Sequence, residues 1–88
     1  MSMEHSLFKA LADGSRRKIL ALLKEQDMSV SDLQKHFQMT QASLSHHLDI
    51  LKRANLVRSR REGQFIFYEI NTSVFEEAAA IIYELFSK

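Results

Sequence analysis

Apolar residues recur every three or four positions along most of this chain, a spacing that predicts amphipathic helices. The clearest case is residues 40–54, where Leu48 and Leu51 fall within about 20–40° of Leu44 on a helical wheel. Thr40 is suited to cap this helix, because its hydroxyl can accept a hydrogen bond from a backbone N–H of the first turn. The pattern therefore predicts a helix with a narrow buried stripe.

The opposite side of this helix differs from an ordinary solvated surface. It carries Ala42, Ser45, His46 and Asp49, followed by Arg53, where a surface helix usually carries Glu and Lys. Short side chains let a helix approach another surface closely and still offer hydrogen-bond donors and acceptors. The floor of a DNA major groove has the polar detail that such a face can read.

Helical spacing also predicts three short helices before residue 40 and one after residue 73. They cover residues 4–11, residues 13–25 with a cap at Asp13 or Ser15, residues 29–37 with a cap at Ser29 or Ser31, and residues 74–86. Gln38 and Met39 connect the third helix directly to residues 40–54. Two short helices joined in this way, the second with a polar outer face, form the helix-turn-helix pattern.

After Asn55 the spacing becomes alternating, which predicts two strands over residues 56–61 and 64–70. Glu62 and Gly63 are the expected turn, because Gly can adopt the positive φ that tight hairpins need. The large side chains of the second strand should alternate between its two sides, with Ile66, Tyr68 and Ile70 on one and Phe65 and Phe67 on the other. A hairpin that follows a helix-turn-helix forms a wing, and its basic tip, residues 60–64, suits a phosphate backbone.

The last predicted helix has more apolar surface than one small domain needs. Its apolar residues form two adjoining stripes, Val74, Ala78, Ile81 and Leu85 in one and Phe75, Ala79, Ile82 and Phe86 in the other. A surface helix usually shows one stripe of about 100° or slightly more. One stripe should pack on its own domain and the other on a second copy in a two-fold dimer, beside the N-terminal helix; a foreign helix is the alternative. The expected interface residues are Leu7, Phe8, Leu11, Phe75, Ala78, Ala79, Ile82 and Phe86.

Together these elements predict a mainly helical fold with a β-hairpin wing, built from four helices, two strands and a final helix in one domain over residues 1–88. The chain has no Cys, which excludes disulfides and thiolate metal sites. No apolar run approaches the ~20 residues of a membrane span, and the N-terminus lacks the order of a signal peptide. A cytoplasmic location without membrane contact is therefore expected.

The formal net charge of +1 conceals an uneven distribution. Five basic residues and no acidic one lie between positions 52 and 61, namely Lys52, Arg53, Arg58, Arg60 and Arg61. Four acidic residues follow from position 69 onward. This segregation suggests one face for a polyanion and another face for a different partner. Arg16 and Arg17 stand at the start of a helix, where cations oppose the helix dipole, so they suggest phosphate contacts, although a solvated face explains them equally well.

Three stretches resemble the ArsR/SmtB family of dimeric winged-helix repressors: residues 11–23 (LADGSRRKILALL), residues 29–57 and residues 61–70 (REGQFIFYEI). The middle stretch, above all SHHLDILKRANLV, is the specific one. The resemblance extends from Leu7 to about Phe86. It implies a homodimeric repressor that binds an imperfect palindrome, with Gln41, Ala42, Ser45 and His46 in the DNA-reading positions and residues 60–64 as the wing.

The chain also departs from the family pattern. Gly14 stands where the family usually has Pro, and Ser29 and Ser31 stand where the thiolate metal sensors carry Cys. The last helix has no His, whereas the zinc-type sensors use His there. The chain is therefore similar to the family's non-metal autorepressors, the sporulation-delay operon type. No metal or other cofactor is expected, and the sequence identifies no inducer.

Two groups of residues are expected to contact double-stranded DNA. The first group would face base edges and comprises Gln41, Ala42, Ser43, Ser45 and His46. The second group would hold phosphates or belong to the wing and comprises Arg16, Arg17, Lys52, Arg58, Arg60, Arg61 and Gln64.

Other chemistry is disfavoured on geometric grounds. His46 and His47 diverge by about 100° on a helix, so they cannot chelate one ion, and His47 is expected to be partly buried. Ser45, His46 and Asp49 share one helix without a strained nucleophile or an oxyanion hole, so no catalytic residue and no enzyme are expected. Two alternatives stay open: the wing could bind an acidic protein, and an activator would have the same fold.

Overall fold

The computed structural model describes the backbone of residues 3–87 and the side chains of residues 6–87, and it confirms a mainly helical fold with a hairpin wing. In chain order the elements are α1 (Met3–Leu11), α2 (Gly14–Glu25), β1 (Met28–Ser29), α3 (Val30–Gln34), α4 (Gln41–Arg53), β2 (Val57–Glu62), β3 (Phe65–Ile70) and α5 (Thr72–Phe86). The strands form one antiparallel sheet in the order β1-β3-β2.

Three helices begin at the capping residues that the sequence offered. The Asp13 side chain accepts from the Arg16 N–H at 3.1 Å, and the Thr40 hydroxyl accepts from the Ser43 N–H, also at 3.1 Å. Ser29 caps α3 in the same way. Each cap satisfies a backbone donor that has no partner inside its helix, which is why these starts could be located from local sequence.

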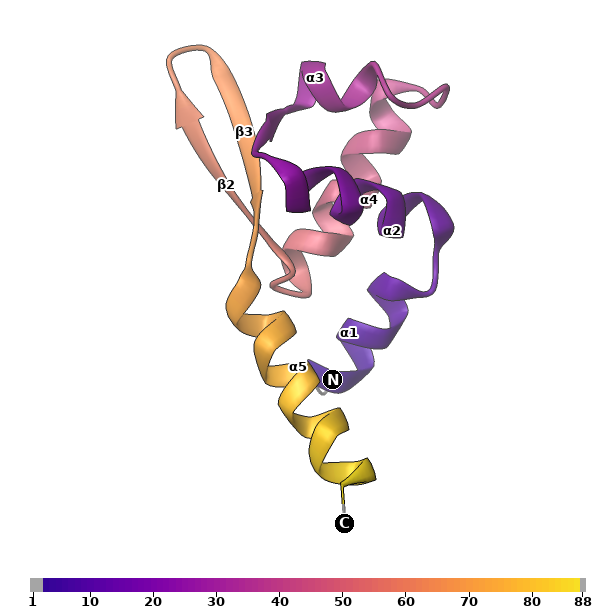
Figure 1. Cartoon of the computed structure of the whole chain (residues 1–88). Coiled ribbons are helices and arrows are strands. Elements are labelled where there is room, and N and C mark those ends of the chain that lie inside the picture. Colours follow the sequence, from indigo (N-terminus) through magenta and orange to yellow (C-terminus); the bar gives the residue numbers. More distant parts are fainter. Residues whose placement is uncertain (1–2, 88) are drawn as a thin grey trace.

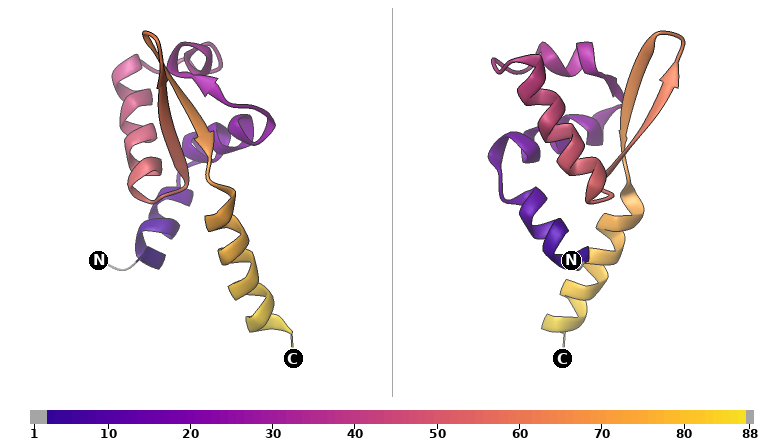
Figure 2. Two further views of the ribbon diagram at one scale, coloured as in Figure 1. Left: turned by 90° about the vertical axis from the view of Figure 1, so that its left-hand side faces the viewer. Right: turned by 180° about the vertical axis from the view of Figure 1, so that it is seen from behind.

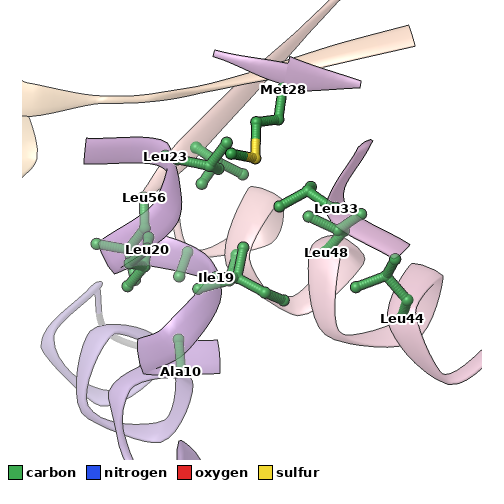
Figure 3. Close-up of a cluster of buried hydrophobic side chains, with 12 residues drawn as sticks. Ala10, Ile19, Leu20, Leu23, Met28, Leu33, Leu44, Leu48 and Leu56 are labelled. Atoms are coloured by element: carbon green, nitrogen blue, oxygen red, sulfur yellow. The ribbon is translucent and has the colours of Figure 1, made fainter. Parts of the chain in front are cut away.

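The core lies between α2, α3 and α4 (Figure 3). Leu44, Leu48 and Leu51 are at most 1% exposed, which confirms the buried stripe of α4. They pack with Ile19 and Leu33, among other fully buried side chains. Burying one such side chain stabilises the fold by about 1.5–3 kcal/mol. This packing directs the opposite, polar face of α4 outward.

The third strand, β1, was not predicted. Residues 26–28 separate two predicted helices, and in the structure Met28 pairs with Tyr68 and Ser29 with Phe67. Two residues are too few to show an alternating pattern, and their partners lie about forty positions along the chain. The predicted order of elements is therefore corrected by one short strand between the second and third helices.

The hairpin turn lies one residue later than predicted. Glu62 pairs with Phe65, which leaves Gly63 and Gln64 as the turn. Gly63 has a φ of +64°, a conformation that costs Gly little and other residues more. The predicted turn, Glu62-Gly63, contains the correct glycine. Gly63 was expected as the second residue of the turn, but it is the first.

The two ends of the molecule carry different elements (Figures 1 and 2). The tip of the wing, α3 and the start of α4 lie at one end, whereas α1 and α5 lie at the other. The molecule extends 48 Å along its longest axis and 23 Å along each of the others. It is elongated because α5 projects away from the core (Figure 2).

Helix α5 differs from its expectation, because neither apolar stripe is buried in its own domain. Val74, Phe75 and Ala78, near its start, are half-buried against the core or its edge. Farther along, Ile82 is 55% exposed and Phe86 is 84% exposed. The two stripes form one continuous face that the body of the domain reaches only at the root of the helix.

Candidate DNA-binding surface

The polar face of α4 is exposed to solvent. The predicted base-facing residues are all exposed, and these are Gln41, Ala42, Ser43, Ser45 and His46. The Thr40 cap also orders the first of them, because its hydroxyl bonds both the N–H and the hydroxyl of Ser43. The side chains that could read bases therefore project from a rigid helix rather than from a loop.

A groove of about 330 Å³ separates the start of α4 from the wing. Gln41 and Ser45 line it from α4, and Gln64 lines it from the hairpin turn. Phe65 and Ile66 form part of the same wall and stay 48% and 41% exposed. Three predicted DNA contacts from two distant segments thus meet around one concave surface.

Two of the predicted phosphate contacts are unpaired cations. The side chains of Lys52, in the last turn of α4, and Arg61, in β2, are exposed and form no hydrogen bond or ion pair with any residue that the structure describes. Arg53 differs, because it pairs with Asp49 at 2.7 Å. Free, solvated cations are the groups that neutralise phosphates and release counterions.

Arg60 instead forms ion pairs with neighbouring carboxylates. Its guanidinium lies 2.8 Å from Asp27, 2.9 Å from Glu62 and 3.5 Å from Glu69, and it sits over the Phe67 ring. The hydrogen bonds to Glu62 and Asp27 raise the pKa of Arg60 above its ordinary value. Arg60 is therefore paired in the free chain, whereas the sequence suggested an unopposed charge, and its phosphate contact stays a prediction.

Arg58 is also paired, at 3.3 Å from Glu69. The three wing cations thus share their surface with three carboxylates, and among the described residues only Arg61 stays unpaired. The basic run looked unopposed in the sequence because Asp27 precedes Arg60 by more than thirty positions. Glu69 lies opposite Arg58 only through the hairpin register.

Arg16 is a second correction, because it is buried and not directed at solvent. Only 9% of it is exposed. Its Nε donates to the Ala10 carbonyl at 2.8 Å and its Nη2 to the Lys9 carbonyl at 3.0 Å. Its Nη1 lies 3.1 Å from His47 Nδ1. Arg16 therefore holds the end of α1, whose last carbonyls have no partner within the helix.

Arg17 supports the same helix end from outside. Its Nη1 donates to the Leu11 carbonyl at 2.8 Å. Its side chain stays exposed and lines a second groove, of about 470 Å³, with Leu20, Ile70 and Phe75 at the root of α5. The structure therefore does not bring Arg17 to the groove between α4 and the wing.

His46 and His47 differ as predicted, the first exposed and the second half-buried. Their ring centroids lie 6.0 Å apart and the rings are tilted. Asp13 lies 3.9 Å from His47, and the backbone hydrogen bond from Arg16 holds the pKa of Asp13 below its ordinary value. No three His, Asp or Glu side chains among residues 6–87 are grouped to hold a metal ion.

The candidate dimer residues separate into two sets. Leu7, Leu11 and Phe75 are half-buried and pack against the core of their own domain, so they offer less free surface than expected, and Ala78 is half-buried as well. The exposed set comprises Phe8, Ala79, Ile82 and Phe86. Helices α1 and α5, which carry both sets, lie at the same end of the molecule (Figure 2).

Within the described part of the chain, no helix has the length and apolar character that crossing a bilayer requires.

Comparison with known proteins agrees with this geometry. A family model described as "Bacterial regulatory protein, arsR family" matches residues 13–59. The transcriptional repressor SdpR of Bacillus subtilis is 47% identical over 84% of this chain and 82% of its own length. The transcriptional activator HlyU of Vibrio cholerae is 32% identical over 91% of this chain and 74% of its own length.

Solved structures of ArsR-like regulators have a similar fold. An ArsR-like transcriptional regulator from Rhodococcus sp. RHA1 superimposes with a TM-score of 0.86 at 28% identity, over 94% of this chain and 78% of that one. The matched family region includes all of α2, β1, α3 and α4 and the beginning of β2. It thus covers the helix-turn-helix and stops before most of the wing and α5.

Proposed function

Because the chain belongs to the ArsR family of bacterial regulatory proteins, we propose that it is a transcriptional repressor that binds an imperfect palindrome as a homodimer. The family consists of DNA-binding regulators, so the chain is a regulator and not an enzyme. A transcriptional regulator acts where the DNA is, which supports the cytoplasm of a bacterial cell as its location. No metal, cofactor or inducer enters the proposal.

One observation carries the DNA-reading assignment. The short polar side chains of α4 project from a helix that the core holds rigidly, and they meet the wing turn across one groove. We assign Gln41 and Ser45 to base edges, Ala42 to close approach, and His46 to a base or a phosphate. Lys52 and Arg61 supply phosphate contacts, because both are exposed and unpaired among the described residues.

The dimer is supported by the exposed apolar face of α5. Ile81, Ile82, Leu85 and Phe86 are each at least 55% exposed, and Phe8 on α1 is 68% exposed. A contiguous apolar face of this kind is unfavourable in water and typically marks an interface. The face can be covered by a second copy in a closed two-fold arrangement. This pairing would leave the α4 end of each copy free.

A two-fold dimer also explains how a chain of this size could read enough DNA to be specific. Two α4 helices would enter successive major grooves about 34 Å apart, and the wings would lie on the flanking backbone. A bound dimer covering a promoter would exclude polymerase. The repressor SdpR supports this direction of control, whereas the related protein HlyU is a transcriptional activator.

The test is selection of binding sites from a random duplex pool with the full chain, followed by transcription from a promoter that carries the selected site. The proposal predicts enrichment of an inverted repeat with half-sites one helical turn apart, and less transcript as protein is added. A rise in transcript would identify an activator instead. If no sequence is enriched although an acidic protein binds the wing, the rival function as a protein-interaction module replaces the proposal.

A further inference from the structure

We propose that His47 is a positioning residue, which fixes the orientation of α4 by accepting a hydrogen bond from Arg16. The inference rests on the proposed function, because it concerns how the DNA-reading face is held in place. His47 does not itself face the groove between α4 and the wing, and the apolar core does not account for its polar contacts.

Arg16 joins three helices through one buried side chain. It belongs to the first turn of α2, and its Nε and Nη2 donate to the carbonyls of Ala10 and Lys9 at the end of α1. Its Nη1 lies 3.1 Å from His47 Nδ1, in the middle of α4. A guanidinium this deeply buried is costly to leave without partners. Each of the three contacts therefore constrains the position of the helix that supplies it.

The geometry also defines the state of the imidazole. An Arg side chain has only donors, so the 3.1 Å contact requires His47 Nδ1 to be the acceptor. The ring is then neutral and carries its proton on Nε2. Asp13 faces the same side of the ring at 3.9 Å, and it accepts from the Arg16 N–H at 3.1 Å. The Asp13 carboxylate also attracts the positive charge of Arg16.

The position of His47 on α4 explains why this bond matters for reading DNA. The three leucines of α4 hold the helix through apolar contacts, which are not directional. His47 lies on the flank between these leucines and the exposed residue His46, and a hydrogen bond depends on both distance and angle. The bond to Arg16 therefore fixes the rotation of α4 about its own axis. Side chains that bond base edges tolerate little displacement, because the bond weakens steeply with poor geometry.

The bond also connects the two ends of the molecule. Arg16 holds the last carbonyls of α1, and α1 carries Phe8, an exposed residue of the proposed dimer surface. Through Arg16 and His47, the helix beside the second copy is therefore tied directly to the helix that reads DNA.

Two substitutions of matched shape test the proposal. His47→Asn keeps an acceptor close to the position of Nδ1, whereas His47→Leu has a similar shape without one. We expect His47→Leu to bind the selected site about tenfold more weakly than the wild type, with binding to random DNA unchanged, and His47→Asn to stay within about threefold. Leu has a higher helix propensity than Asn. If helix stability alone determined the affinity, His47→Leu would therefore bind more tightly than His47→Asn. Thermal unfolding of both variants shows whether the chain is folded.

Equal affinity of His47→Leu and the wild type for the selected site would overturn the inference, as would equal losses in both variants. If His47→Leu does not fold, ¹⁵N NMR of the wild-type imidazoles at pH 8 decides the matter. The inference predicts that His47 is protonated on Nε2, and a proton on Nδ1 would overturn it. If the wild type selects no DNA sequence, the proposed function fails, but the NMR measurement still tests the Arg16–His47 bond.

Discussion

Helices α4 and α5 are both amphipathic, but only α4 completes its packing within one chain. Its three leucines are at most 1% exposed, whereas Ile82 and Phe86 on α5 are 55% and 84% exposed. One copy can therefore present the polar face of α4, which we propose reads DNA, in its final form. In the proposed dimer a second copy would cover the apolar residues at the opposite end, so folding of the α4 end and assembly of that dimer would depend on separate sets of side chains.

The largest expected effect comes from breaking the core under α4. Leu48→Ala should lower the free energy of unfolding by about 2–5 kcal/mol, because the deleted methyl groups no longer contribute their burial and a cavity is left in their place. Leu48→Met, which keeps the volume, should cost less than about 1.5 kcal/mol. Denaturant unfolding at one fixed protein concentration measures both. Equal small losses would mean that α4 is not held by this core.

The second effect concerns α5 and leaves the core intact. Ile82→Lys should give a folded monomer that loses specific DNA binding, since it places a charge in the apolar face. Ala80→Lys is the matched control, because Ala80 lies on the acidic side of the same helix and should stay dimeric. Sedimentation velocity and circular dichroism separate the outcomes. A dimeric Ile82→Lys variant would remove this face from the interface.

A smaller effect is expected at the DNA-reading face. Gln41→Ala should reduce discrimination at one base pair in each half-site by about 1–3 kcal/mol. Its binding to random DNA and its oligomeric state should not change. Gln26→Ala, at the end of α2, is the control of the same chemistry. An unchanged preference profile for Gln41→Ala would exclude this residue from base reading.

The smallest effect distinguishes the two adjacent arginines of the wing. Arg61→Ala should reduce the slope of log affinity against log salt by about 0.9, the value for one lost phosphate contact. Arg60→Ala should change the slope less, because Arg60 is already paired with carboxylates. A salt series on the selected site measures both slopes. A larger change for Arg60→Ala would show that its ion pairs open on DNA.

The sequence predicted best those features that depend on near neighbours. Thr40 caps α4 through the Ser43 N–H only three positions away, and the leucine stripe follows from helical spacing. The exposed side of α4 and the half-buried His47 were predicted for the same reason, because both are fixed by position on one helix.

The features that sequence reasoning missed depend on distant partners. Asp27 neutralises Arg60 across more than thirty positions, and β1 exists only because Met28 and Ser29 pair with β3. Arg16 looked like a free cation at the wrong end of a helix, since the carbonyls of α1 that it bonds become available only in the folded chain. Two exposed cations, Lys52 and Arg61, could not be told apart from their paired neighbours by composition alone.

The most direct test of the central claim is sedimentation equilibrium of the wild-type chain, alone and with the selected duplex. The account predicts a mass twice that of the 10.2 kDa chain for the free protein, and two copies on each duplex. A folded monomer that binds the selected site as a single copy would contradict it.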